Sequence, residues 1–385
     1  MIDFKLPAPT RRAVAAGALS LLAAPAVQAA PKSEQLVYVG TQGNEAGQGV
    51  FAARLDPSTG KLTPIGVGAE LARPTWIVAH PSRQSLYAVS ETGNDGKSQG
   101  KVHALKADPK TGALTLVSTV DSGGGGPTHL ALDAPGSGLL VAHYGSGHVA
   151  ALPLRADGGL EPPASVQQEQ GSGPSPRQKS AHAHGVALDP SGKFALVADL
   201  GSDKVFVHPY DRRTRRLAPA AATSVSVPPG TGPRHLAFHP NGRLVFLISE
   251  LAPAIRTFGW EARKGALKEL DAVRAGGDPP INGAEIAISR DGRFVYASIR
   301  VEHVIVVYAV DQKTGALTEI QRTPSGGQTP WSFGIDPTGR WLLAANQGSG
   351  TVTVLARDPA SGKLTATDQS VAVAKPTSIA FLSSH

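Results

Sequence analysis

The chain has no cysteine, and aromatic residues make up only 5% of its 385 residues. The absence of cysteine excludes disulfide bonds, thiolate catalysis and cysteine metal sites. Glycine and proline are frequent by contrast, at 44 and 31 residues. This composition favours many short strands joined by turns over long helices.

A concentrated surplus of one charge is also missing. The formal net charge of +7 is spread thinly, apart from four arginines within residues 212–216, in a predicted turn. A nucleic-acid surface needs a basic stripe, ideally with aromatic side chains to stack on bases. We therefore expect no nucleic-acid partner and interpret the arginine cluster as a solvated loop.

No apolar run is long enough for a permanent membrane anchor. The Ala/Leu-rich run of residues 13–24 is too short to span a bilayer. Arg11 and Arg12 precede it, and residues 27–29 resemble a small-residue cleavage site. Residues 1–30 are thus predicted to be an export signal, of the general or the twin-arginine type. The mature protein is expected to be periplasmic or secreted.

One pattern recurs along the rest of the chain. In residues 181–201, the apolar runs 185–188 and 194–198 flank the turn Asp189-Pro190-Ser191-Gly192, which predicts a β-hairpin. A third strand and commonly an Asp-x-x-x-Gly-x-Leu turn follow each such hairpin. The units start 47 to 56 residues apart, at Pro74, Pro127, Ala183, Pro233, Gly283 and Pro330.

Repeats of this length, with four strands each, indicate a β-propeller. The chain ends supply a further unit. Residues 376–382 read as a first strand without a second, whereas residues 36–41 and 49–55 read as second and third strands without a first. We therefore predict an all-β fold, with residues 31–385 forming one seven-bladed propeller of four-stranded antiparallel blades. A blade shared between the N- and C-termini closes it.

In such a propeller, the start of each first strand and the end of each second strand lie at the same end of a hairpin. These positions would ring one mouth of the central channel. They are Thr75 with Glu91, Thr128 and His129 with His143 and Tyr144, His182 and His184 with Asp199, Arg234 and His235 with Glu250, Glu285 with Arg300, Trp331 and Ser332 with Asn346 and Gln347, and Thr377 and Ser378 with Thr41 and Gln42. Convergent titratable groups in a concavity are functional candidates.

Several of these positions have structural alternatives. Asp199 could fix the turn that follows it, and Arg234 with Glu250 could be a structural ion pair. His182 and His184 project to the same face of a strand. Two ligands do not make a metal site, however, and no third ligand stands at a distinctive spacing, so we expect neither a metal nor another cofactor.

Two further features have conformational interpretations. His80, His239 and Asp336 stand in the turn between the first two strands of their units and are interpreted as turn formers. Residues 167–179 form a polar Gly/Pro/Ser-rich stretch. We interpret this stretch as an inserted loop in preference to a lid over the mouth.

Three motifs resemble a known family: AHAHGVALDPSGKFALVADLG, GPRHLAFHPNGRLVFLISEL and GAEIAISRDGRFVYASIR. They are similar to those of the seven-bladed propeller lactonases, which include propeller-type 6-phosphogluconolactonases and fungal carboxymuconate lactonizing enzymes. The resemblance covers residues 35–382. It implies a site built from His182 or His184, Arg234, Glu250 and Arg300.

The chain departs from the family pattern at two places. Ser249 and Ile299 stand where the family usually has asparagine, directly before the glutamate and the second arginine of the implied site. These departures leave the charged groups intact and leave the identity of the substrate open.

We predict an exported, metal-independent lactonase, similar to 6-phosphogluconolactonase, that hydrolyses a sugar or sugar-acid lactone. Glu250 or His184 would accept a proton from the attacking water. Arg234 and Arg300 would stabilise the oxyanion and hold an anionic substituent. The predicted catalytic residues are His182, His184, Glu250 and Arg300, and the predicted substrate-binding residues are Arg234, His235, Glu285 and Asp199.

The expected partner is one small lactone, anionic or polyhydroxylated, bound by a monomer. Because export separates the protein from cytosolic phospholactones, an unphosphorylated aldonolactone or another lactone is the expected substrate. Two other functions stay open: a non-enzymatic periplasmic platform for binding or assembly, and a muconate-type cycloisomerase. The fold does not decide among them. Convergence of the charged groups on one cavity would favour an enzyme, and a flat or occluded mouth would favour the platform.

Overall fold

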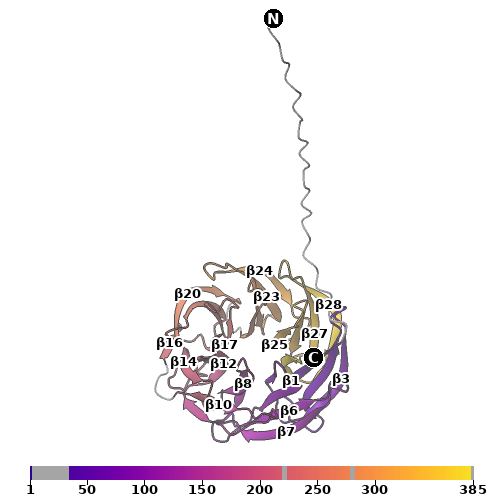
Figure 1. Ribbon diagram of the computed structural model, residues 1–385, viewed down its shortest axis with the longest axis vertical. Helices are drawn as coiled ribbons and strands as arrows, with labels where there is room; N and C mark the ends of the chain where they lie inside the picture. The colour runs from indigo at the N-terminus through magenta and orange to yellow at the C-terminus, as the bar shows by residue number, and fades with distance from the viewer. Residues whose placement is uncertain (2–33, 219–222, 278–281, 383–385) are drawn as a thin grey trace. The chain divides into compact units, whose positions relative to one another are not determined.

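Seven antiparallel sheets are arranged around a central axis (Figure 1). The structure is a computed structural model that describes Met1 and residues 34–218, 223–277 and 282–382. The described residues form strands and turns, without any helix that could cross a membrane. The predicted export signal, beyond Met1, lies outside the described residues.

The strands of each blade run in sequence order from the axis outwards, except that the last strand of the chain is the innermost strand of blade 1. Blade 1 comprises β29 (Pro376–Phe381), β1 (Gln35–Thr41), β2 (Gly49–Leu55) and β3 (Leu62–Glu70). Blade 2 comprises β4 (Ile77–Ala79), β5 (Ser85–Ser90), β6 (Lys101–Ala107) and β7 (Leu114–Asp121). Blade 3 comprises β8 (Pro127–Leu132), β9 (Gly138–His143), β10 (His148–Pro153) and β11 (Ser165–Gln168). Blade 4 comprises β12 (Ala183–Leu188), β13 (Phe194–Asp199), β14 (Lys204–Asp211), β15 (Arg216–Leu217) and β16 (Thr223–Ser226). Blade 5 comprises β17 (Pro233–Phe238), β18 (Leu244–Ser249), β19 (Ala254–Glu261) and β20 (Ala266–Arg274). Blade 6 comprises β21 (Gly283–Ile288), β22 (Phe294–Ile299), β23 (Val304–Val310) and β24 (Leu317–Pro324). Blade 7 comprises β25 (Pro330–Ile335), β26 (Trp341–Asn346), β27 (Thr351–Arg357) and β28 (Leu364–Ala372).

Two details of the blades differ from the sequence-based prediction. Blade 4 carries a fifth strand, because the two-residue β15 pairs with β14 beside β16. The predicted loop 167–179 begins too early, since its first two residues belong to β11. The seven-bladed, all-β architecture itself is confirmed.

The ends of the chain meet in blade 1, as predicted. β29 pairs with β1 in antiparallel register, with Val37 opposite Phe381 and Gly40 opposite Ser378. The Thr377 hydroxyl donates a hydrogen bond of 2.8 Å to the main-chain oxygen of Thr75 at the start of blade 2. The inner edge of β1 is thereby paired and the ring is closed, so that no blade is left unpaired at an end of the chain.

The turns between the first and second strands owe their shape to one polar side chain. In blade 4, the Asp189 carboxylate accepts hydrogen bonds from the main-chain N–H groups of Lys193 and Phe194. This pattern of side-chain acceptance favours Asp in turns. The resulting hairpin of β12 and β13 lies where the sequence predicts it and is slightly longer at the mouth end.

Histidine replaces this aspartate in blades 2 and 5. Nδ1 of His80 accepts a main-chain hydrogen bond within its own turn, and Nε2 lies 3.0 Å from the main-chain oxygen of Gly136 in blade 3. His239 joins blade 5 to Gly292 of blade 6 in the same manner, also at 3.0 Å. These histidines therefore form turns, as expected, and also tie neighbouring blades together.

The Asp-x-x-x-Gly turns dock each blade against its neighbour. Gly60 and Gly362 have φ angles of +76° and +74°, a conformation that L side chains rarely adopt. A Cβ atom at Gly60 would lie 2.5 Å from the Trp341 ring, and one at Gly362 would lie 2.4 Å from the Phe294 ring. Glycine is thus required both by the turn and by close contact with an aromatic ring of the preceding blade.

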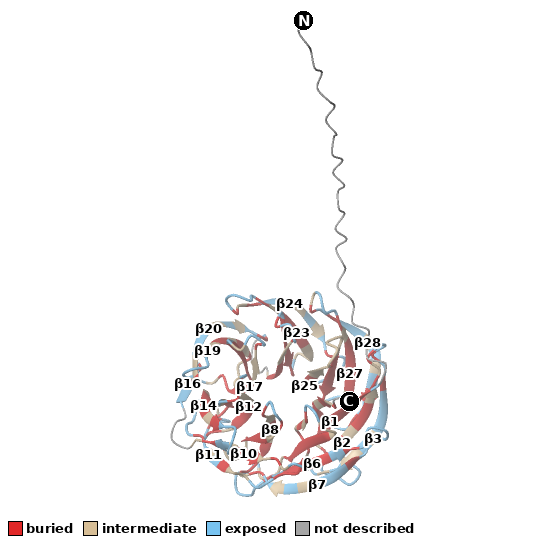
Figure 2. Ribbon diagram, in the orientation of Figure 1, coloured by how far each residue is buried: buried red, intermediate tan, exposed pale blue. Residues whose placement is uncertain are grey.

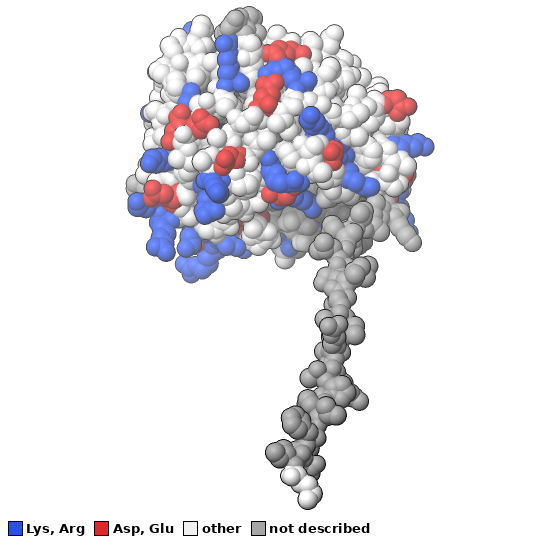
Figure 3. Space-filling view, turned by 90° about the horizontal axis from the view of Figure 1, so that it is seen from above, with Lys and Arg blue, Asp and Glu red and all other residues white. Residues whose placement is uncertain are grey.

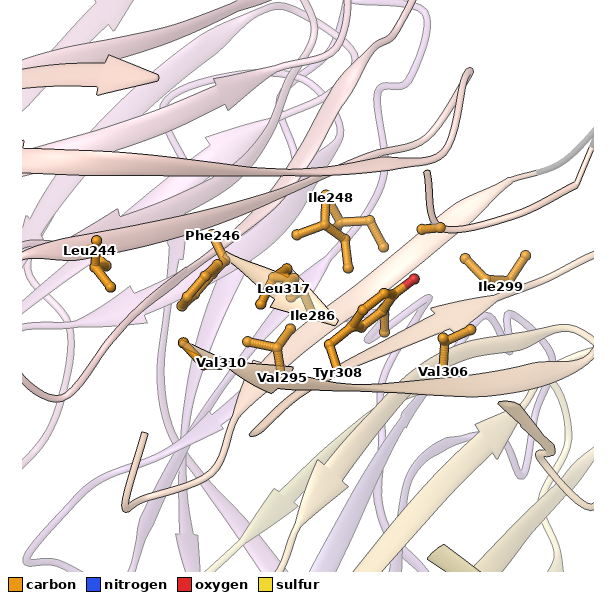
Figure 4. Close-up of a cluster of buried hydrophobic side chains, with 13 residues drawn as sticks. Leu244, Phe246, Ile248, Ile286, Val295, Ile299, Val306, Tyr308, Val310 and Leu317 are labelled. Atoms are coloured by element: carbon orange, nitrogen blue, oxygen red, sulfur yellow. The ribbon is translucent and has the colours of Figure 1, made fainter. Parts of the chain in front are cut away.

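Seven hydrophobic clusters fill the seven interfaces between blades. Between blades 5 and 6, Phe246 and Ile248 of β18 pack against Val295 of β22 and Tyr308 of β23 (Figure 4). The buried residues lie on the inner strands, whereas the outermost strands are largely exposed (Figure 2). The apolar core is therefore a ring of contacts between sheets.

The outer surface contributes little to this stability. Lys and Arg side chains lie beside Asp and Glu side chains over much of the face drawn in Figure 3. Exposed pairs such as Arg322 with Glu302 and Glu319 are solvated, and such pairs typically contribute about 0 to 1 kcal/mol. The fold depends on the clusters between blades and on closure.

Closure of blade 1 can be tested at Ala380 of β29, which is only 7% exposed in the cluster between blades 1 and 2. We expect Ala380→Asp to lower the free energy of unfolding by about 3 kcal/mol or more, because a buried, unpaired carboxylate is costly. Ala366→Asp is the matched control, because Ala366 is exposed on β28. It should cost less than about 1 kcal/mol. Urea unfolding measures both, and equal losses would contradict the role of β29.

Candidate active site

A β-bulge places the side chains at the mouth of the channel. In blades 3, 4, 5 and 7 the pairing of the first strand with the second shifts by one residue near the start of the first strand. The extra, unpaired residues are Thr128, His184, Arg234 and Trp331. Bulges bend a strand and re-aim a side chain. These four side chains are therefore directed by the backbone irregularity itself.

The glutamate that follows the second strand of blade 5 is the centre of the site. Glu250 follows β18, and its side chain is 3% exposed. Oε2 lies 3.0 Å from Nε of Arg234, and Oε1 lies 3.0 Å from Nη2 of Arg300. Nη1 of Arg177 donates a hydrogen bond of 2.5 Å to Oε1. Nε2 of His184 lies 3.6 Å from Oε2.

The electrostatics follow from this arrangement. Burial alone would raise the pKa of Glu250, but the charges of Arg300, Arg234 and Arg177 outweigh burial and hold that pKa well below its usual range. Glu250 is therefore ionised at neutral pH. Burial, with Arg300, lowers the pKa of Arg234 to about 10, which leaves it charged at neutral pH.

His184 is neutral in the same environment. Burial and the charge of Arg234 hold the pKa of His184 well below its usual value, against the opposing effect of Glu250. Nδ1 of His184 is buried without a hydrogen-bond partner among the described residues. Nε2 is therefore the ring nitrogen that faces the carboxylate. A neutral imidazole beside a carboxylate can accept a proton, because the carboxylate stabilises the imidazolium that forms.

The ring of Trp331 lies close to the guanidinium groups of both Arg234 and Arg300. The guanidinium carbon of Arg300 is 4.7 Å from the centroid of its ring, and that of Arg234 is 5.9 Å away. Arg234 also donates a hydrogen bond of 2.7 Å to the main-chain oxygen of Ala284. These contacts hold the two guanidinium groups in fixed positions, since cation–π contacts strengthen when desolvated.

A second layer of polar residues lies beside Arg234. Nδ1 of His235 is 3.1 Å from Oε1 of Glu285, whose Oε2 accepts a hydrogen bond of 2.9 Å from Ser332. Burial raises the pKa of Glu285 and lowers that of His235. His235 and Glu285, predicted to bind substrate, are not among the residues that line the cavity at the mouth. In this structure they pack around Arg234.

His182 and Asp199 also lie away from the cavity wall. Oδ1 of Asp199 accepts hydrogen bonds from the main chain of Ser202, at 2.8 Å, and of His182, at 3.1 Å. Asp199 thus fixes the turn after β13, the structural alternative that the sequence left open. The His182 ring stacks on Tyr144 at 4.7 Å between centroids, and Nδ1 is 2.6 Å from the main-chain oxygen of Tyr144.

The mouth contains a cavity of about 380 Å³. Its lining residues come from all seven blades and one loop: Gln42, Arg73, Glu91, Asn94, Thr128, Tyr144, Arg177, His184, Glu250, Asn282, Arg300 and Trp331. The charged groups that the sequence predicted therefore converge on a concave site, since Glu250, Arg300 and His184 line it and Arg234 contacts Glu250.

Four lining residues were not predicted from the sequence. Arg73, Asn94 and Asn282 lie in the connections next to the predicted ring positions. Arg177 lies in the inserted loop between blades 3 and 4, where no regular spacing marks it. Its Nη2 donates a hydrogen bond of 2.8 Å to the Tyr144 hydroxyl. Only the polar character of residues 167–179 could have indicated this contact.

The described residues contain no group of three or more His, Cys, Asp or Glu side chains placed to hold a metal ion. A second cavity, of about 400 Å³, lies at the first turns of blades 6 and 7. Its aspartates, Asp291 and Asp336, accept hydrogen bonds from residues of their own turns. The mouth cavity is therefore the candidate active site.

The match to known proteins covers nearly all described strands: residues 36–381 match the family described as lactonase, 7-bladed beta-propeller. The chain is 32% identical to the 6-phosphogluconolactonase of Bacillus subtilis over 348 residues, which are 90% of this chain and 97% of that protein. It is 29% identical to the 6-phosphogluconolactonase of Formosa agariphila, over 85% of this chain and 93% of that protein. The solved structure of the periplasmic gluconolactonase of Pseudomonas aeruginosa is 36% identical, with a TM-score of 0.84 over 91% of this chain and 99% of that one.

The buried charges predict how stability depends on pH. Because its folded-state pKa is lowered, Glu250 stabilises the fold above its unfolded pKa of about 4.3, and this stabilisation is lost as pH falls below that value. We expect Glu250→Gln to lower the free energy of unfolding at pH 7 by about 3 kcal/mol, since Arg234 loses its buried partner. The variant should also lose less stability than the wild type between about pH 4.5 and pH 3.

Glu269→Gln is the control for this measurement, because Glu269 is exposed and paired with Arg256 on the outer part of blade 5. It should change the free energy of unfolding by less than about 1 kcal/mol. Urea unfolding at several pH values measures all three proteins. Parallel pH profiles for Glu250→Gln and the wild type would contradict the assignment.

Proposed function

Because the chain belongs to the seven-bladed β-propeller lactonase family, we propose that it hydrolyses a sugar or sugar-acid lactone. One observation carries the proposal: Glu250, Arg300 and His184 converge, with Arg234 behind them, on a cavity large enough for one sugar ring. An occluded or flat mouth would instead have favoured a non-enzymatic platform.

In the proposed reaction, His184 accepts a proton from water while the water oxygen adds to the lactone carbonyl carbon. His184 is preferred to Glu250 as the acceptor, because both oxygens of the Glu250 carboxylate already accept hydrogen bonds from guanidinium groups. Glu250 instead stabilises the imidazolium at 3.6 Å. Such positioned proton transfer typically contributes about 10² to 10⁴ in rate.

The addition turns the carbonyl oxygen into an oxyanion, which the Arg300 guanidinium on the cavity wall would stabilise. The bond between the carbonyl carbon and the ring oxygen then breaks. The ring oxygen takes the proton from the His184 imidazolium and leaves as a hydroxyl group. The product is the open-chain hydroxy acid, and the imidazole is neutral again.

The rest of the cavity wall supports a polyhydroxylated substrate. Gln42, Asn94 and Thr128 also line the cavity. Amide and hydroxyl groups both donate and accept hydrogen bonds, which suits sugar hydroxyls. His182 would act indirectly in this proposal, by stacking on Tyr144.

Export from the cytosol forms part of the proposal. It is supported by the signal-like composition of residues 1–30 and by likeness to the periplasmic gluconolactonase of Pseudomonas aeruginosa. A sugar-acid lactone or an unphosphorylated aldonolactone is then the substrate class that the protein would meet. The chain is proposed to act as a monomer, since residues from all seven blades of one propeller already line the cavity.

The test is hydrolysis of δ-gluconolactone, its 6-phosphate and γ-lactones by the purified protein, followed as proton release in weak buffer above the spontaneous rate. We expect turnover by the wild type and a loss of about 100-fold or more in kcat/KM for His184→Gln. The double variant Glu250→Gln, Arg300→Ala should show no turnover above background, since it loses both partners of the reacting groups.

A matched double variant, Glu269→Gln with Arg213→Ala, changes the same residue types at exposed positions. It should retain wild-type turnover. If the wild type hydrolyses none of these lactones above background, the proposal is wrong and the non-enzymatic platform is favoured. Turnover of a conjugated diacid instead would favour the cycloisomerase.

A further inference from the structure

We propose that Arg177 is a specificity-determining residue that exchanges Glu250 for an anionic group of the lactone and so links substrate charge to catalysis. The inference rests on the proposed function and deepens it. It concerns a residue on an inserted loop, whereas the other partners of Glu250 lie on or directly after the inner strands of the blades.

Arg177 differs from the other arginines around Glu250 in exposure. Its side chain is 44% exposed, against 1% for Arg234 and 7% for Arg300. Its guanidinium is held by the Glu250 carboxylate and the Tyr144 hydroxyl. Water and a ligand can therefore reach Arg177 more readily than Arg234 or Arg300. Arg177 is the guanidinium that can exchange Glu250 for another anion, because solvent or ligand can replace the lost partner.

The backbone beneath Arg177 is firmly held. The next residue, Gln178, is fully buried. Its Nε2 donates a hydrogen bond of 2.8 Å to the main-chain oxygen of Leu200, and its Oε1 accepts one of 3.0 Å from the main-chain N–H of Ser175. Gly173 also donates to the main-chain oxygen of Gln178 at 2.8 Å. The loop thus fixes the origin of the Arg177 side chain, so that only the side chain has to turn when its guanidinium exchanges one anionic partner for another.

The charges around Glu250 leave positive charge without a partner. The groups that face or adjoin this carboxylate are Arg177 from the loop, His184 from β12, Arg234 and His235 from β17, and Arg300 after β22. Three guanidinium groups therefore share one carboxylate. An incoming anion can bind one of them without leaving Glu250 uncompensated.

Arg177 is better placed for that anion than Arg73, a half-buried arginine of the cavity wall. Nε of Arg73 donates a hydrogen bond of 2.8 Å to the main-chain oxygen of Glu91, and Nη2 lies 3.7 Å from its carboxylate. The planar guanidinium of Arg177 suits a phosphate or a carboxylate equally. The shared ligand chemistry is thus an anionic group on a sugar lactone.

The exchange has a catalytic consequence. While Arg177 is bound to Oε1, part of the negative charge of Glu250 is compensated and less of it stabilises an imidazolium at His184. When the substrate anion takes Arg177, Glu250 retains Arg234 and Arg300 and stabilises the imidazolium more strongly. Binding of a charged lactone would therefore strengthen the interaction of Glu250 with the His184 imidazolium. Because this imidazolium forms only during the reaction, the stronger interaction would lower the barrier of the chemical step.

The experiment compares Arg177→Gln with the wild type on three lactones: neutral δ-gluconolactone, its 6-phosphate, and glucaro-1,4-lactone, which carries a carboxylate. We expect kcat/KM for at least one of the two anionic lactones to fall by about tenfold or more, mainly through KM, since a charge-assisted hydrogen bond is lost. We expect kcat for the neutral lactone to rise, because Glu250 is relieved of one cation. Which anionic lactone responds distinguishes phosphate from carboxylate recognition.

Two variants serve as controls. Arg177→Lys keeps the charge but loses the planar fork, so it should recover part of the preference for the anionic lactone. Arg213→Gln removes one exposed arginine in the turn after β14 and should leave all three rates unchanged. If Arg177→Gln lowers the rates on neutral and anionic lactones by the same factor, Arg177 only braces Tyr144 and the inference is wrong.

A binding measurement separates this inference from the proposed function. Calorimetry compares 6-phosphogluconate and glucarate, which each carry a second anionic group, with gluconate on the wild type and on Arg177→Gln. Tighter binding of either of the first two acids that disappears in Arg177→Gln supports the role of Arg177, even if no lactone is hydrolysed. Equal binding of all three acids by the wild type, or binding of none, overturns it.

Discussion

The pairing of β29 with β1 is the constraint on which the rest of the molecule depends. It joins residues more than 300 positions apart and turns a row of sheets into a closed ring, in which each blade packs against two others through a hydrophobic cluster. Closure also determines where chemistry can occur. Because the innermost strands all start on the same side of the ring, the polar side chains at those starts meet at one mouth, although their blades contact only their neighbours.

The bulges convert this ring into a site. Each one interrupts the alternation of side chains at the start of an inner strand and directs His184, Arg234 or Trp331 as the regular pleat would not. The propeller buries charged side chains whose burial would be unfavourable without a partner, since burying an unpaired ion costs several kcal/mol. Glu250 compensates Arg234, and Arg234 in turn prevents protonation of Glu250. Three guanidinium groups share the single Glu250 carboxylate, and the positive charge left over is the part of the site that a ligand can compensate.

The sequence predicts the fold well because the fold is periodic. Six repeats and two half-units are sufficient for seven blades, and the spacing within each hairpin places Glu250 and Arg300 at the mouth without any coordinates. The prediction stops where periodicity stops. It could not choose between His182 and His184, since one bulge residue exchanges the faces of a strand. It also predicts that His235, Glu285 and Asp199 bind the substrate. In the structure these residues are not part of the cavity lining: His235 and Glu285 pack around Arg234, and Asp199 holds a turn. Arg177 could not be predicted, because an inserted loop has no repeat against which its position can be counted.

The same distinction bears on substrate choice. Ser249 and Ile299, where the chain departs from the family pattern, are both fully buried and do not line the cavity. Ile299 belongs to the cluster between blades 5 and 6, so its effect on a ligand must pass through Arg300, the next residue. Side chains that reach the mouth from the loops between strands, such as Arg177, therefore contact a ligand more directly than Ser249 or Ile299 does. A loop can change without disturbing the blades, whereas a substitution at a bulge alters both the packing and the catalytic groups.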